Sequence, residues 1–371
     1  MIDKTIEILD KLISIDTTIT IDTMAAVDYI QELLDKSGAR THRVMSPNGK
    51  RASLLATIGD PVRAGVIFSG HMDTVAAAAD EWNYPPHKLT LVDSRLYGRG
   101  TTDMKGAIAA ILANIDALAA SGNTYHIVLT HDEEGGFSAI RQLVASNFDN
   151  FFGAKPRGCI VMEPTELTPI VAHKGGFRAQ INVTGKSAHS AYPELGVDAG
   201  EYIVRAYIAL REIFKKHSES WAPDDCFSPN HTTVNIGTLC AGDAVNKIPG
   251  SAELSYMMRY LPGNDIIGFN NDIAKLCKDL DIDIKSKDPS CSVEFIPGVN
   301  VESFAADANS DFVKMFGKGA KVSFATEAGF FAKLGIPTIV FGPGNIAQAH
   351  TVDEFIEISE LEKFNEWIKG I

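Results

Sequence analysis

The sequence lacks several features that would assign it to a class at once. None of its apolar runs reaches 18 of the 371 residues, which argues against a transmembrane helix. Its 34 Lys and Arg are outnumbered by 47 Asp and Glu, and the formal net charge is −13. This excess of negative charge would repel the phosphates of a nucleic acid. We therefore expect no nucleic-acid partner and no membrane partner.

Cysteine is also scarce, and its spacing is irregular. Five cysteines, an odd number, do not suggest a disulfide framework. Residues 1–18 lack the basic start and continuous apolar segment of a secretion signal. Apolar residues at helical spacing, from Ile6 to Ile13, instead predict an amphipathic helix there. These observations together predict a reducing, cytoplasmic location.

The chain is longer than one hydrophobic core usually supports, so we expect two domains. Strand patterns in residues 51–59, 63–71, 124–132 and 157–164 alternate with helix patterns, of which residues 104–122 form the clearest. The last three strand patterns are continuous apolar runs, as expected for strands covered on both faces. This alternation predicts a three-layer α/β domain.

The pattern changes near residue 176. From there the order is strand, helix, two strands, helix and strand, which matches a ferredoxin-like α+β unit. After about residue 295 the first pattern returns. We therefore predict a discontinuous α/β domain, residues 1–175 and 295–371, with a small domain, residues 176–294, inserted into it.

Metal-ligand residue types follow four strand patterns of the predicted α/β domain, residues 63–71, 124–132, 157–164 and the apolar run "IPTIVFGPG" at residues 336–344. Open α/β sheets place their sites at the carboxyl ends of strands, so residues distant in sequence can converge there. A further candidate stands where the 104–122 helix pattern begins. The candidates are His71, Asp103, Glu133, Glu134, Glu163 and His350.

Imidazole and carboxylate ligands without thiolate suit zinc, or cobalt or manganese in its place. The set exceeds the needs of one tetrahedral ion and fits two ions that share a carboxylate and a water. In the adjacent pair Glu133–Glu134, one carboxylate can bind metal while the other moves the proton of that water. The alternatives are a charge pair at a helix N-terminus for the glutamates and an ordinary N-cap for Asp103.

Asp73 lies two residues after His71 in the stretch "SGHMDTV". An aspartate there can accept the second ring N–H of a metal-binding histidine and fix its tautomer. The alternative is a turn residue that faces solvent.

The stretches "SGHMDTV", "LYGRGTTDMKGAIAA", "THDEEGG", "VMEPT", "GKSAHSAYPELGVDA" and "GPGNIAQAHTVDEF" resemble, in order, those of the dinuclear zinc amidohydrolases. This family includes acetylornithine deacetylases, succinyl-diaminopimelate desuccinylases, aminoacylases and glutamate carboxypeptidases. The resemblance spans nearly the whole chain. Residues 324–350 are similar to the acetylornithine deacetylase branch, whereas desuccinylases usually have a Ser- and Gly-rich stretch with an aspartate in place of "TEAGFF".

The resemblance implies a role for each candidate. His71 and Glu163 would bind one zinc ion, Glu134 and His350 the other, with Asp103 bridging. Glu133 would be the general base and Asp73 the partner of His71. It further implies a homodimer formed through the inserted domain.

Four more residues are candidates for contacts with substrate. His189, in the small-residue loop "GKSAHSAYP", could stabilise an oxyanion, and the resemblance implies that it can come from the partner subunit. Arg259 could bind an α-carboxylate and Asn246 could add a hydrogen bond, while Glu327 could pair with the δ-ammonium of ornithine. Alternatives are a surface histidine, an ion pair of Arg259 with Glu253, and a turn-stabilising asparagine.

The sequence thus predicts a metal-dependent enzyme that hydrolyses the amide bond of an N-acyl amino acid, foremost N-acetyl-L-ornithine. A sibling activity on the same scaffold, such as an aminoacylase, dipeptidase or desuccinylase, is the first alternative. A metal- or peptide-binding protein without catalysis is the second.

Overall fold

The computed structural model describes all residues, 1–371, and divides them into two compact units. Unit 1 comprises Met1–Ala172, Phe304–Ala320 and Thr326–Ile371, and unit 2 comprises His173–Ser303 and Lys321–Ala325. None of the helices combines the length and apolarity that crossing a bilayer requires.

Unit 1 is built on a nine-stranded sheet in the order β1-β2-β6-β3-β7-β15-β8-β13, with β14 beside β8. The central strands β6, β3, β7 and β15 run parallel. A small second sheet has the order β16-β5-β4. The strands are β1 (Arg40–Met45), β2 (Ala52–Ile58), β3 (Val66–His71), β4 (Thr90–Val92), β5 (Arg95–Tyr97), β6 (Tyr125–Thr130), β7 (Gly158–Val161), β8 (Ile170–His173), β13 (Phe304–Ala305), β14 (Ala320–Val322), β15 (Thr338–Val340) and β16 (Phe355–Glu357).

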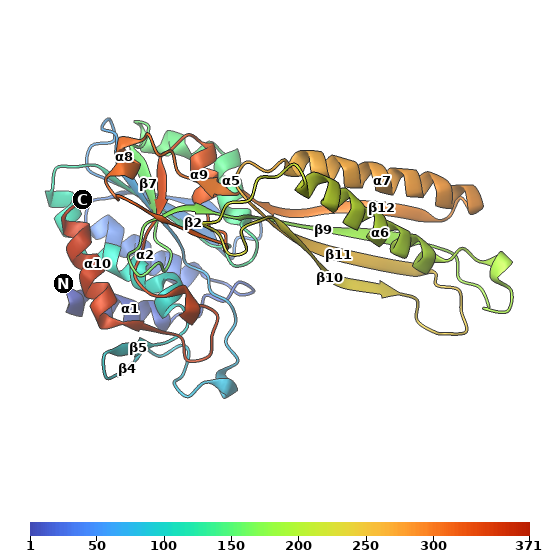
Figure 1. Ribbon diagram of the computed structural model, residues 1–371. Helices are drawn as coiled ribbons and strands as arrows, with labels where there is room; N and C mark the ends of the chain where they lie inside the picture. The colour runs from blue at the N-terminus through green and yellow to red at the C-terminus, as the bar shows by residue number, and fades with distance from the viewer. The chain divides into compact units, whose positions relative to one another are not determined.

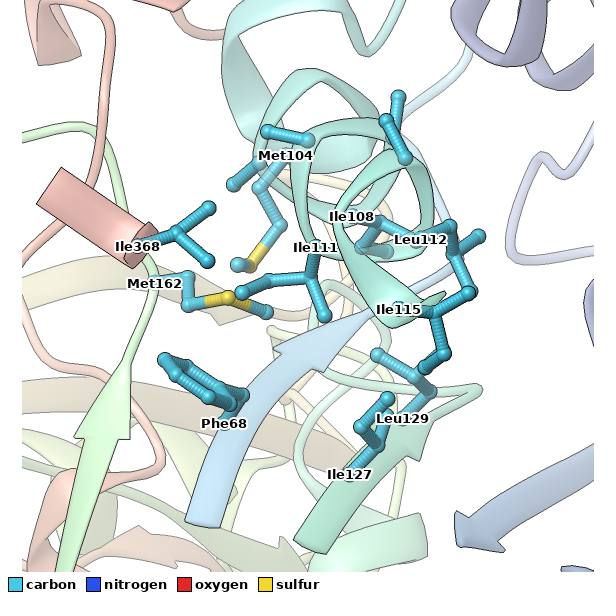
Figure 2. Packing of buried hydrophobic residues seen from close by; sticks show 14 of the residues in the cluster. Phe68, Met104, Ile108, Ile111, Leu112, Ile115, Ile127, Leu129, Met162 and Ile368 are labelled. Atoms are coloured by element: carbon cyan, nitrogen blue, oxygen red, sulfur yellow. The ribbon is translucent and has the colours of Figure 1, made fainter. Parts of the chain in front are cut away.

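Helices cover both faces of this sheet (Figure 1). The helices are α1 (Ile2–Ile13), α2 (Met24–Lys36), α3 (Gly106–Ala113), α4 (Ile115–Ala120), α5 (Ser138–Ala145), α8 (Asp311–Lys314), α9 (Ala328–Lys333) and α10 (Ile358–Lys369). Figure 2 shows Ile108, Ile111 and Leu112 of α3 packed over Phe68 and Leu129 of the sheet. Every residue of β2, β3, β6 and β7 is buried, which confirms the predicted strands covered on both faces.

Unit 2 follows the predicted order, strand, helix, two strands, helix and strand. Its antiparallel sheet has the order β10-β11-β9-β12, the arrangement of a split βαβ or ferredoxin-like unit. Helices α6 and α7 pack together and share one core with the sheet (Figure 1). The elements are β9 (Gly175–Thr184), α6 (Ala199–Ser218), β10 (Thr233–Ala241), β11 (Ser251–Tyr260), α7 (Ile266–Lys287) and β12 (Ser292–Val301). The predicted fold class is confirmed in both units.

The structure corrects the prediction of one helix over residues 104–122. Two shorter helices, α3 and α4, meet at Asn114. The Asn114 side chain donates to the Ala110 carbonyl oxygen at 2.9 Å and to Asn365 Oδ1 at 2.6 Å. This side chain competes with the helical backbone for the same acceptor, which breaks the helix at a fully buried position.

Candidate functional site

The candidate ligands of unit 1 lie where its parallel strands end. His71 is the last residue of β3, and Glu163 follows its parallel neighbour β7 by two residues. Glu133 and Glu134 follow β6, the neighbour on the other side. His350 follows β15, which is parallel to β7. The carboxyl ends of these adjacent strands therefore bring residues from 71 to 350 to one edge of the sheet.

His71 faces two carboxylates through one ring nitrogen. Its Nε2 lies 2.9 Å from Asp103 Oδ1 and 3.9 Å from Glu163 Oε1. Its Nδ1 lies 2.9 Å from the backbone carbonyl oxygen of Asp73, which can only accept a hydrogen bond. Nδ1 therefore carries a hydrogen, and the Nε2 of neutral His71 directs its lone pair at the carboxylates. A lone pair in that position is favourable only with a proton or a cation between the two atoms.

The expected role of the Asp73 carboxylate is corrected by the same contact, because the main chain of Asp73 and not its side chain fixes the His71 ring. The nearer Asp73 carboxylate oxygen lies 3.8 Å from Nδ1. The carboxylate instead accepts the backbone N–H groups of Glu133 at 3.2 Å and Glu134 at 3.0 Å. Asp73 is buried and so is not the solvent-facing turn residue of the alternative. It ties the loop that carries the two glutamates to the segment after His71.

His350 completes a second group of ligands. Its Nε2 lies 2.7 Å from Glu134 Oε1 and 3.3 Å from Asp103 Oδ2. Asp103 thus directs one oxygen toward His71 and the other toward His350. Its position between two imidazoles is the observation on which our interpretation of the site depends.

Three groups of side chains here could hold a metal ion. They are His71, Asp103 and Glu163; Asp103, Glu134 and His350; and His71, Glu133 and Glu134. Within each group the ligand atoms lie within 4.8 Å of one another. Because zinc–ligand bonds are about 2.0–2.1 Å long, two ligand atoms of a tetrahedral zinc ion lie about 3.3 Å apart. The donors are already at that scale of separation, and their imidazole and carboxylate chemistry fits a divalent cation.

Electrostatics in the site also favour a cation. Four carboxylates, those of Asp103, Glu133, Glu134 and Glu163, face two imidazoles, and none of them pairs with lysine or arginine. Burial and the carboxylates of Asp103 and Glu134 raise the pKa of Glu163 to about 8. Burial likewise raises the pKa of Glu133 well above its usual range. Uncompensated buried carboxylates are costly, and bound cations would remove that cost.

The same carboxylates also raise the pKa values of the two histidines. Hydrogen bonds to Asp103 and Glu134 raise the pKa of His350 to about 10. Burial alone would lower the pKa of His71, yet Asp103 and Glu163 raise it well above its usual range. Each imidazole is thus held where positive charge is stabilised, which is where a metal ion would bind.

The alternatives for these residues do not match the structure. Asp103 has φ −121° and ψ 90° in the segment Thr101–Lys105, ahead of α3, and it does not cap that helix. Glu133 and Glu134 lie in a turn, and the following helix α5 begins only at Ser138.

Comparison with known proteins agrees with this geometry. Residues 67–370 match the peptidase family M20/M25/M40. The chain belongs to this family. An acetylornithine deacetylase from Aliivibrio salmonicida is 36% identical over 320 residues, which cover 84% of this chain and 81% of that protein. An acetylornithine deacetylase from Vibrio cholerae is 35% identical over 326 residues, or 86% and 82% of the two chains. The expected resemblance is confirmed, and this M20/M25/M40 member is a metal-dependent amidohydrolase.

Solved structures of other proteins share the fold of this chain over nearly its whole length. A metallo-carboxypeptidase of family M20 from Sulfolobus solfataricus superposes with a TM-score of 0.75 at 17% identity, covering 99% of this chain and 98% of that chain. A tripeptidase from Staphylococcus aureus superposes with a TM-score of 0.73 at 17% identity, covering 100% and 97%. At these identities the likeness concerns the fold alone.

Glu327, the candidate partner for an ammonium group, is buried in unit 1. It occupies the N-cap position of α9, is 1% exposed, and accepts a hydrogen bond from Ser69 Oγ at 3.3 Å. Burial raises its pKa to about 7. It lies in the interior of unit 1 against Ser69, which precedes His71 by two residues on β3. Its pairing with the δ-ammonium of ornithine stays a prediction.

The three remaining candidates belong to unit 2. His189 is exposed, and its Nδ1 accepts the Ala191 N–H at 3.0 Å. Its segment pairs with that of Asn246, since Ser190 N–H donates to the Asn246 carbonyl oxygen at 3.1 Å. Arg259 is on the predicted face of β11 together with Glu253, but the two form no ion pair. The structure thus brings His189 and Asn246 into neighbouring loops and leaves Arg259 apart from them.

Sequence reasoning assigned no role to three buried residues that shape the ligand loops. Asp132 accepts hydrogen bonds from Ser138 after the Glu133–Glu134 turn. Lys105 Nζ donates to the carbonyl oxygens of Leu12 and Ile15, each at 3.0 Å. Glu354 binds the loop that carries Asp103. The only signal for them was their place beside candidate ligands in the motif stretches.

Proposed function

We propose that the protein hydrolyses N-acetyl-L-ornithine to L-ornithine and acetate. The amidohydrolase class follows from the family, and the substrate is suggested by relatives named acetylornithine deacetylase at 35–36% identity over most of the chain. The observation that carries the chemistry is the Asp103 carboxylate between the Nε2 atoms of His71 and His350. This substrate would place the enzyme in arginine biosynthesis. Its five free cysteines agree with a reducing, cytoplasmic location.

The proposed ligands form two sets that share Asp103. His71 and Glu163 would hold one ion, and Glu134 and His350 the other. Zinc fits the mixed imidazole and carboxylate donors, and cobalt or manganese are possible substitutes. When bound, the ions supply polarisation of the scissile carbonyl and a lowered pKa of the attacking water.

Glu133 is the proposed proton carrier. Its carboxylate lies beside His71 and Glu134 but belongs to neither of the two sets that share Asp103. Its raised pKa allows it to take the proton that leaves the attacking water. Glu133 would then give this proton to the nitrogen of the departing amine as the C–N bond breaks. Asp73 holds the Glu133 backbone in place during both transfers.

Unit 2 is the proposed lid and dimerisation domain. His189 would stabilise the oxyanion, Asn246 would donate a hydrogen bond, and Arg259 would bind the α-carboxylate. Along β9, Gly176 pairs with Arg259 and Thr184 with Ser251, next to the loop of Asn246. The eight residue steps between these pairs span about 27 Å, so unit 2 of one copy does not bring all three side chains to one small ligand. This separation supports a homodimer in which the partner subunit supplies His189.

A panel of N-acyl amino acids tests the substrate. We would measure kcat/KM of zinc-loaded protein for N-acetyl-L-ornithine, N-acetyl-L-methionine, N-succinyl-L,L-diaminopimelate and an unmodified dipeptide. The proposal predicts a preference for N-acetyl-L-ornithine of at least about tenfold. Preference for another member of the panel would support a sibling activity on the same scaffold. Absence of hydrolysis of every compound would overturn the proposed reaction.

A further inference from the structure

Glu354 makes an unusual set of contacts for a fully buried carboxylate. Its Oε2 accepts hydrogen bonds from the Gly100 N–H at 2.8 Å and from Arg99 Nη1 at 2.7 Å. Its Oε1 accepts the N–H groups of Thr102 at 2.9 Å and Asp103 at 3.0 Å. One side chain therefore satisfies three backbone donors of the loop 99–103 and pairs with a buried arginine.

That loop cannot satisfy its donors by itself. Gly100 has φ 85°, and Asp103 and Met104 have non-helical dihedral angles, so no regular ladder forms before α3. Buried backbone N–H groups need partners, and a carboxylate that accepts several of them forms strong, charge-assisted bonds. Glu354 supplies these partners to the residue that lies between His71 and His350.

Glu354 also belongs to the segment that carries His350, four residues before it. Further bonds join this segment to the loop. Thr102 Oγ1 donates to the Phe355 carbonyl oxygen at 2.6 Å, and Arg99 Nη2 donates to that of Thr351 at 3.2 Å. The Gly98 N–H donates to the backbone carbonyl oxygen of Glu354 at 2.9 Å. The segments of Asp103 and His350 are thus joined through Glu354.

We propose that Glu354 is a positioning residue that sets the spacing between Asp103 and His350 and thereby the affinity for the ion they share. This inference rests on the proposed function, because it takes both residues as metal ligands. Glu354 touches neither ion nor substrate in this account. It acts through the loop 99–103, and its effect should appear in metal affinity even where no reaction occurs.

The test is a titration of metal-free protein with cobalt, followed by absorbance well below the melting temperature. Glu354→Gln retains the shape of the side chain but replaces one carboxylate oxygen by an amide NH₂ group. That oxygen accepts two hydrogen bonds, whereas the NH₂ group can only donate and would face two donors. We expect about 10- to 100-fold weaker binding in one phase of the titration. His350→Ala identifies that phase, because it removes a ligand of the same ion. Glu357→Gln is the matched control, since Glu357 binds only Ser94 and Arg95 on the surface and should leave both phases unchanged.

Glu354→Gln leaves the buried Arg99 without its carboxylate partner, which can prevent folding. Thr102→Val provides a second test for that case. It removes the hydrogen bond to the Phe355 carbonyl and keeps the buried ion pair, so we expect about 2- to 10-fold weaker binding in the same phase. Cobalt affinities equal to wild type in a folded variant, with only a lower melting temperature, would overturn the inference and leave the proposed function intact. A wild-type protein that binds no cobalt would overturn both.

Discussion

Replacement of Glu133 by glutamine separates proton transfer from metal binding. The change keeps the side-chain volume and removes the only site that can take up a proton there. General acid–base catalysis contributes about 10²- to 10⁴-fold to a rate, or about 3–5.5 kcal/mol in the barrier. We expect a loss at the upper end of this range, because Glu133 is proposed to act in both proton transfers. Initial rates of ornithine release from N-acetyl-L-ornithine measure the loss.

The neighbouring residue supplies the matched comparison. Glu134 lies 2.7 Å from His350 in the Asp103-sharing set, whereas Glu133 lies outside both such sets. Elemental analysis should therefore find full metal content in Glu133→Gln and a reduced content in Glu134→Gln. A Glu133→Gln protein that keeps a tenth of the activity would refute the assignment of the base. A Glu133→Gln protein that has lost metal would refute the separation of roles.

Three further predictions concern stability. Zinc added to metal-free protein should raise the melting temperature, since a ligand at about 100 times its Kd stabilises the folded state by about 2.7 kcal/mol. An unchanged melting temperature would argue against zinc binding at Asp103, Glu134 and Glu163. Asn365→Ala should lower the free energy of unfolding by about 2–3 kcal/mol in urea, because it removes buried hydrogen bonds to both Asn114 and Thr5; a loss below about 0.5 kcal/mol would contradict this. Burial lowers the pKa of His126 to about 4 from 6.5, so the unfolded chain binds more protons between these values and stability falls as the pH drops through them, by up to about 3 kcal/mol. His126→Gln should flatten this dependence in urea denaturation at a series of pH values, and an equally steep profile would show that other groups cause it.

The regular elements of the fold could be predicted because their patterns are local. Buried strands such as β3 and β7 are continuous apolar runs between turn residues, and α1 shows helical spacing. The break at Asn114 could not be predicted in this way, because its cause is a buried partner, Asn365, that lies 251 residues away. A polar side chain in an apolar helix pattern gives no sign of which partner it will meet.

The same distinction applies to the site. Ligand residue types at strand ends were visible in the sequence, and the order of parallel strands brings them together. The depth of a side chain was not visible, so the sequence did not show that Glu327 is almost fully buried. Asp73 shows a further limit, because backbone geometry decides whether its carbonyl or its carboxylate meets His71. Glu354 was missed because three of its four hydrogen-bond donors are backbone N–H groups, which carry no sequence signal.

Metal content and activity measured together on one preparation test the central claim most directly. Purified protein would be analysed for metal and assayed for ornithine release before chelation, after chelation, and after zinc is restored. The account predicts about two zinc ions per chain and an activity that is lost on chelation and recovered with zinc. Activity that survives complete removal of metal, or protein that takes up no metal when zinc is supplied, would contradict it.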